Sequence, residues 1–108
     1  MDIHVIWDTL EKTIIEMDAG RGDWETNVQT VQAAILLLLE YPPEEIMSRV
    51  KGCGLPPKAV VSWLVWEALK IEVADREKLS GLCAYWNREM KGTYGDLVVP
   101  GLPRPGGL

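Results

Sequence analysis

The chain has 108 residues, the size of one ordinary domain, and its 47% hydrophobic content is enough to build a core without disulfides. We expect that core to rely on Leu, Ile, Val and Trp, because Phe is absent and Trp occurs five times. The formal net charge of −5 divides into −7 over residues 1–50 and +2 over residues 51–108. The acidic first half argues against broad attraction to nucleic-acid phosphates or anionic lipid, whereas the second half leaves a local anionic contact open.

Three features bear on the cellular compartment. The first residues, Met1 to His4, show no basic start followed by an apolar run, so no signal peptide is expected. The longest apolar run, Ala33 to Leu39, is far shorter than a membrane span. Cys53 and Cys83 are isolated thiols in a chain without secretory features. We therefore expect a cytoplasmic protein with no membrane partner, in which both cysteines are reduced core residues.

The first helix is predicted over residues 3–17, with Asp2 as its N-cap. Apolar residues recur there at spacings of four, three, four and three, which places them on one face of a helix: Ile3, Trp7, Leu10, Ile14 and Met17. The glycines of Gly20-Arg21-Gly22 then break the helix, and Asp23 is placed to cap the next one.

The second helix is predicted over residues 24–40. Residues 33–39 are apolar on every side of it, and a helix that is apolar all round is normally buried all round. We therefore expect this to be the central helix, surrounded by the others. A short buried strand over residues 35–39 is the alternative, and a leucine-rich rather than β-branched composition disfavours it.

Three further helices are predicted in the second half. Pro43 opens a short third helix, which the turn at Gly52-Cys53-Gly54 ends. The fourth helix is expected over residues 57–73, and its first residue is again a proline. Asp75 is placed to cap a fifth helix that runs through Met90.

The character of the chain changes at Gly92, because residues 92–108 hold five glycines and three prolines and offer no periodic apolar face. The predicted fold is therefore all-α: a compact bundle of about five helices with an irregular Gly/Pro-rich C-terminal tail. We assign residues 1–91 to a single helical domain and residues 92–108 to an extended tail, which is held to the domain near Leu97-Val98-Val99.

Known catalytic and metal-binding patterns are not evident in the sequence. His4 is the single histidine, and a metal site built from His4, Cys53 and Cys83 would need a fourth ligand. Glu44 and Glu45 are adjacent, so they point to different faces of a helix and suit its first turn better than an acid–base pair. We predict no enzyme, no metal and no cofactor; an enzyme that uses Cys53 in its glycine turn is a distant alternative.

One arrangement is similar to a known class. Residues 28–70 resemble the trihelical core of helix-turn-helix and winged-helix regulators, most of all in Gly54-Leu55-Pro56-Pro57-Lys58-Ala59-Val60 followed by Trp63-Leu64. The resemblance implies a DNA-binding transcriptional regulator whose fourth helix enters the major groove, with Lys58, Ser62 and Lys70 as candidate DNA contacts. The spacing from Ile46 to Leu55 is longer than in that motif. The exposed positions of the fourth helix, which would read the DNA, include only one basic residue, Lys58.

The fourth helix also carries apolar residues on more than one face. Val61, Val65 and Trp66 would form an exposed strip unless other helices cover both sides of it, and soluble monomers rarely leave such strips uncovered. We therefore predict a non-enzymatic binding module, a protein-interaction or regulatory accessory protein that forms a homodimer or binds another protein through these three residues. The DNA-binding regulator is the alternative, and the acidic balance disfavours nucleic acid as a partner.

Overall fold

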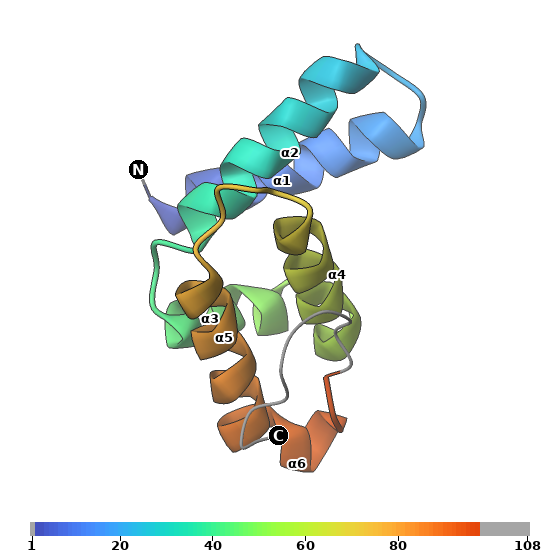
Figure 1. The fold of residues 1–108 in the computed structure, drawn as a ribbon. Helices are drawn as coiled ribbons and strands as arrows, with labels where there is room; N and C mark the ends of the chain where they lie inside the picture. Colours follow the sequence, from blue (N-terminus) through green and yellow to red (C-terminus); the bar gives the residue numbers. More distant parts are fainter. Residues whose placement is uncertain (1, 98–108) are drawn as a thin grey trace.

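The structure is a computed structural model and describes residues 2–97. Within that range the chain is helical and contains no strand, which confirms the predicted all-α class (Figure 1). The elements are α1 (Ile3–Asp18), α2 (Trp24–Leu38), α3 (Pro43–Gly52), α4 (Pro57–Leu69), α5 (Arg76–Tyr85), the π-helical segment η1 (Trp86–Met90) and the short α6 (Lys91–Tyr94).

The helix starts follow the capping residues that the sequence indicates. The side chain of Asp2 accepts a hydrogen bond from the His4 backbone N–H at 2.8 Å, and Asp23 accepts one from the Thr26 N–H at 3.0 Å. Asp75 accepts from the Glu77 N–H at 2.9 Å. Helices α3 and α4 have no side-chain cap and instead begin with a proline, whose missing N–H would have no partner in the first turn.

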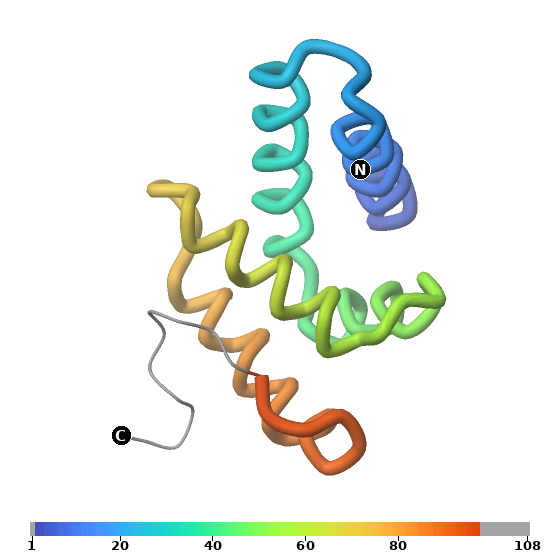
Figure 2. The backbone as a smooth tube through the Cα atoms, turned by 90° about the vertical axis from the view of Figure 1, so that its right-hand side faces the viewer, coloured from blue at the N-terminus to red at the C-terminus, as the bar shows by residue number. Residues whose placement is uncertain are grey.

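The helices form two groups. Helices α1 and α2 lie side by side as a hairpin, joined by the turn at Gly20–Gly22 (Figure 1). Helices α3, α4 and α5 form the second group, and α4 runs across the end of the hairpin, where it contacts α2 (Figure 2). The short C-terminal helix α6 packs against η1 at the far end of α5. The core therefore lies where α4 meets the α1–α2 hairpin, α3 and α5.

The prediction that α2 is the central, fully surrounded helix is wrong. Its inward face is buried at Val31, Ile35 and Leu38, but Ala33 and Leu37 are exposed. Helix α2 packs along α1 on one side and touches α4 near its C-terminal end, so part of its apolar surface faces solvent. An apolar composition alone does not show which helix the others surround.

The C-terminal boundary also differs from the prediction. The helical conformation crosses the expected junction at residue 92 and continues through Tyr94, after the π-helical segment at Trp86–Met90. Leu97 packs against the core, as predicted for the point where the tail is held. The remainder of the predicted tail, residues 98–108, lies outside the described residues. Helix α4 ends at Leu69 instead of Val73, because the chain turns at Ile71, whose carbonyl accepts from the Ala74 N–H.

Candidate functional site: an apolar groove between α1 and α4

An apolar groove opens between α1 and the first half of α4, with the α3–α4 turn at one end. Its volume is about 300 Å³, and one side is open to solvent. We call it the α1–α4 groove and define it by its lining residues: Trp7, Leu10, Glu11, Ile14, Cys53, Leu55, Pro56, Ala59, Val60, Trp63 and Leu64. Glu11 is the only charged residue among them.

The α1 wall of the groove follows from the periodicity of the sequence. Trp7, Leu10 and Ile14 belong to the apolar stripe that predicts the first helix. Trp7 and Leu10 are buried in the structure. The opposite wall is formed by residues of α4 at helical spacing, including Val60 and Trp63. The groove is thus a gap between two helix faces, and its deepest lining residues, Trp7, Leu10 and Leu64, belong to the core.

The α3–α4 turn shapes the end of the groove. Gly54 has a φ of 81°, a left-handed backbone conformation that residues other than glycine rarely adopt. The two prolines that follow restrict the backbone and set the start of α4 at Pro57. Leu55 lies between these constraints and leaves 62% of its surface exposed while it lines the groove. This leucine is therefore presented to solvent at the mouth.

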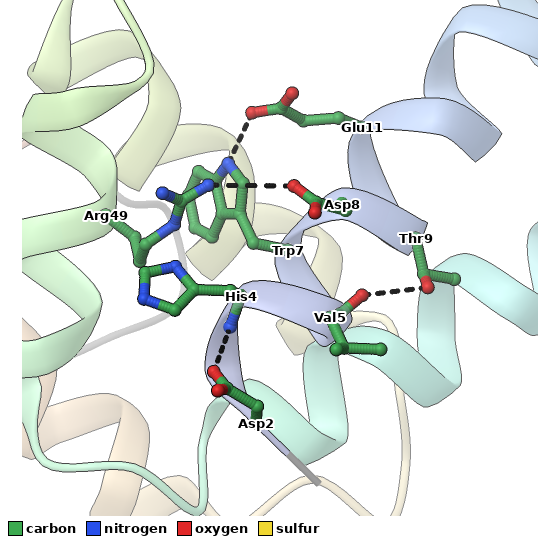
Figure 3. Close-up of polar contacts among 8 residues, drawn as sticks. All are labelled: Asp2, His4, Val5, Trp7, Asp8, Thr9, Glu11 and Arg49. Atoms are coloured by element: carbon green, nitrogen blue, oxygen red, sulfur yellow. Dashed lines mark hydrogen bonds and ion pairs between the residues drawn. The ribbon is translucent and has the colours of Figure 1, made fainter.

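Trp7 is held in place by two polar neighbours. Its indole Nε1 donates a hydrogen bond to Oε1 of Glu11, one helical turn further along α1 (Figure 3). The Arg49 guanidinium of α3 reaches across to the Trp7 ring, 5.8 Å from its centroid, and Nη2 of Arg49 lies 3.8 Å from Oδ1 of Asp8 (Figure 3). Nε of Arg49 is buried without a hydrogen-bond partner among the described residues. Cation–π contact and hydrogen bond together fix the ring that forms the groove wall.

Both cysteines are free thiols, but only Cys83 is a core residue as predicted, because Cys53 is half-buried at the surface. Cys53 is half-buried, lines the groove and donates a hydrogen bond from Sγ to the Val50 carbonyl at 3.0 Å. Cys83 is buried in the core, and this burial raises the pKa of its thiol because the thiolate would lose its hydration. Within residues 2–97, no three His, Cys, Asp or Glu side chains come together in a cluster that could bind a metal ion.

The interface predicted on α4 is largely incorrect. Val61 and Val65 are fully buried, each with 0% of its surface exposed, and belong to the core. The reason is that α2 and α3 both pack against α4 and cover the faces that carry these valines. Trp66 alone remains at the surface, with 46% of its side chain exposed and its ring 5.9 Å from the Lys70 ammonium. The sequence therefore predicted an apolar strip where the structure has a single exposed tryptophan.

The candidate DNA contacts do not gather into one basic surface. Lys58 lies at the start of α4 and Lys70 at its C-cap, so the two are separated by the length of the helix. Lys70 is paired with Glu67 at 3.1 Å, and Ser62 between them is half-buried. A surface that contacts phosphates needs several unpaired cations together.

No protein-family model, curated protein or solved structure matches this chain significantly. The resemblance of residues 28–70 to helix-turn-helix regulators therefore stays a prediction. None of the helices within residues 2–97 is both long and apolar enough to cross a lipid bilayer.

The groove itself was missed by the sequence reasoning, although most of its residues had been singled out. The sequence pattern places Trp7, Leu10 and Ile14 on one face of the first helix, and Leu55 and Pro56 between the glycine turn and the fourth helix. What periodicity does not give is the angle and spacing at which two helices cross, and these decide whether their apolar faces meet or leave a gap. The one sequence feature that could have indicated the groove is Leu55, a large apolar residue placed between a glycine and two prolines, where the chain turns at the surface.

Proposed function

We propose that this protein is a non-catalytic binding module that takes apolar side chains of a partner protein into the α1–α4 groove. The observation that carries the proposal is the groove itself, an open hollow with an almost wholly apolar lining that includes Trp7 and Trp63. Tryptophans in partly desolvated pockets are the residues that most often dominate binding energy at protein interfaces.

The dimensions of the groove favour a protein partner over an enclosed small ligand. Its volume of about 300 Å³ is at the lower end of the range for small-molecule pockets. One side is open, so a ligand there would keep part of its surface in water. A protein segment that inserts a few apolar side chains would cover the mouth and also contact the exposed Leu55.

The chemistry of the lining supports a binding role. Its polar side-chain groups are the Glu11 carboxylate and the Cys53 thiol, and each makes one hydrogen bond within its own neighbourhood. Among the described residues, Glu11 accepts from the Trp7 indole and Cys53 donates to the Val50 carbonyl, and neither of these partners is a histidine or a carboxylate. Acid–base or nucleophilic catalysis needs such a partner within hydrogen-bond reach.

A displayed library of random peptides about 16 residues long, enough for roughly four helical turns, tests the proposal. The library is selected on the wild-type protein, and each enriched peptide is then measured on two variants. Ala59→Trp places a large side chain at a groove position, whereas Ala33→Trp makes the same change at an exposed position of α2 outside the groove. Circular dichroism checks that both variants keep the helical content of the wild type.

We expect enriched peptides to lose at least tenfold in affinity on Ala59→Trp, about the effect of removing one interface hot spot, and to bind Ala33→Trp as tightly as the wild type. If no peptide is enriched, or if all of them bind the two variants equally, the groove is not a protein-binding site and the proposal is wrong.

A further inference from the structure

We further propose that the segment bound in the α1–α4 groove is an amphipathic helix that carries a basic side chain beside its apolar anchors, and that this side chain pairs with Glu11. This inference rests on the proposed function and adds the chemical class of the partner. Two features carry it: the spacing of the lining residues along α1, and the charge at the rim of the groove.

The α1 wall is as long as the contact face of a docked helix. Its lining residues Trp7, Leu10, Glu11 and Ile14 span two helical turns, about 10 Å at 1.5 Å per residue. A helix that lies in a groove contacts it through anchors at i, i+3 or i+4, and i+7, which span the same length. A docked helix in either direction would contact this wall mainly through Glu11 and Ile14, its more exposed residues, while the buried Trp7 and Leu10 form the base of the groove.

Glu11 supplies a negative charge at the rim of an otherwise apolar surface. One carboxylate oxygen accepts from the Trp7 indole, which fixes the side chain beside the groove. Within residues 2–97, no lysine, arginine or histidine forms an ion pair with Glu11. A partner that covers the groove would desolvate this carboxylate, and a Lys or Arg at that position would compensate for the lost hydration.

The charge of the neighbourhood favours the same class of partner. Helix α1, which forms one wall of the groove, holds four acidic residues and one basic residue, a net charge of −3. A second copy of this chain has a net charge of −5, so overall like-charge repulsion opposes self-association. A basic segment is attracted by the same field, and electrostatic complementarity of this kind sets partner choice.

The experiment compares selections of the same peptide library on four proteins: the wild type, Glu11→Gln, Glu11→Lys and Glu72→Lys. Glu11→Gln removes the charge and keeps an oxygen for the Trp7 indole. Glu72→Lys is the matched control for Glu11→Lys, since it makes the same change of net charge in the loop after α4, outside the groove. Peptides are counted only if Ala59→Trp weakens their binding.

We expect groove-dependent peptides selected on the wild type to be enriched in Lys and Arg three or four positions from their apolar anchors. This enrichment should disappear on Glu11→Gln, turn into enrichment of Asp and Glu on Glu11→Lys, and remain on Glu72→Lys. A single basic peptide should bind Glu11→Gln about threefold to tenfold more weakly than the wild type, the range for a partly exposed ion pair.

The outcomes separate the two proposals. Groove-dependent peptides without a basic residue, or with the same basic enrichment on Glu11→Gln, overturn the pairing with Glu11 and leave the binding function standing. Groove-dependent peptides rich in Pro and unable to form a helix overturn the helical partner. If no selected peptide depends on the groove, the proposed function itself fails.

Discussion

The indole Nε1 of Trp86 donates a hydrogen bond of 2.9 Å to the backbone carbonyl of Gly95, nine residues further along the chain. Trp86 is buried, with 1% of its surface exposed, and the ring of Tyr94 lies 5.8 Å from it. These contacts join the end of α6 to the domain core. They also explain why the helical structure continues past the predicted boundary at residue 92.

Replacing Trp86 should show how much this contact stabilises the fold. Trp86→Phe keeps an aromatic ring but removes the N–H group and part of the buried surface. We expect the free energy of unfolding to fall by about 1–3 kcal/mol, from one lost hydrogen bond and a small cavity. Urea unfolding followed by circular dichroism measures the change, and a loss under about half a kcal/mol would show that the contact to Gly95 is not structural.

The two adjacent residues Val65 and Trp66 should respond differently to a charge. Val65 is fully buried, so Val65→Glu places an unpaired carboxylate in the core and should destabilise the fold by about 3 kcal/mol or more. Trp66 is exposed, and Trp66→Glu should cost about 1 kcal/mol or less. Thermal unfolding of both variants measures the difference. Equal stability of the two would contradict the burial of α4 described above.

The sequence predicted local structure well. The Asp2, Asp23 and Asp75 caps, the proline starts of α3 and α4 and the apolar stripe of α1 are all local features, set by residues within one or two helical turns. Each of them was read from spacing and composition, and the structure confirms them.

The sequence predicted tertiary placement less well. Helix α4 is apolar on several sides, and two arrangements satisfy that pattern: burial by neighbouring helices, or exposure at an interface. The choice depends on where α2 and α3 lie, which local spacing does not encode. For this reason Val61 and Val65 were assigned to a surface. The α1–α4 groove was missed for the same reason, because its shape depends on how two helices cross.

The two thiols should differ in reactivity. Burial raises the pKa of Cys83, so its reactive thiolate is scarce near neutral pH, and its side chain is also shielded. Cys53 is half-buried at the groove. We expect N-ethylmaleimide to modify Cys53 first in the native protein, with Cys83 reacting only on unfolding. Peptide mapping by mass spectrometry measures the two rates, and equal rates would contradict this placement. Labelled Cys53 should also weaken peptide binding, since the adduct would occupy groove space.

The N-cap of α2 should make stability depend on acidity. Hydrogen bonds from the Thr26 hydroxyl and backbone N–H hold the pKa of Asp23 below its ordinary value of 3.8. The charged cap therefore contributes stability above that pH, and the contribution is lost as the pH falls through the lower pKa of the folded state. Asp23→Asn keeps a capping oxygen without a titrating group.

We expect the melting temperature of the wild type to fall more than that of Asp23→Asn on acidification from about pH 6 to about pH 2, because the asparagine cap does not protonate in that range. Melting curves followed by circular dichroism give both series. A difference between the two proteins that stays constant with pH would show that the Asp23 charge does not contribute.

The claim that the α1–α4 groove binds a partner is tested most directly by the indole N–H signals of the five tryptophans in an NMR titration with a selected peptide. Trp7 and Trp63 line the groove, whereas Trp24 and Trp66 are exposed elsewhere and Trp86 is buried near the C-terminal end. We expect the Trp7 and Trp63 signals to shift with the peptide and the Trp24 and Trp66 signals to stay in place. A shift confined to Trp24 or Trp66, with Trp7 and Trp63 unchanged, would contradict the account.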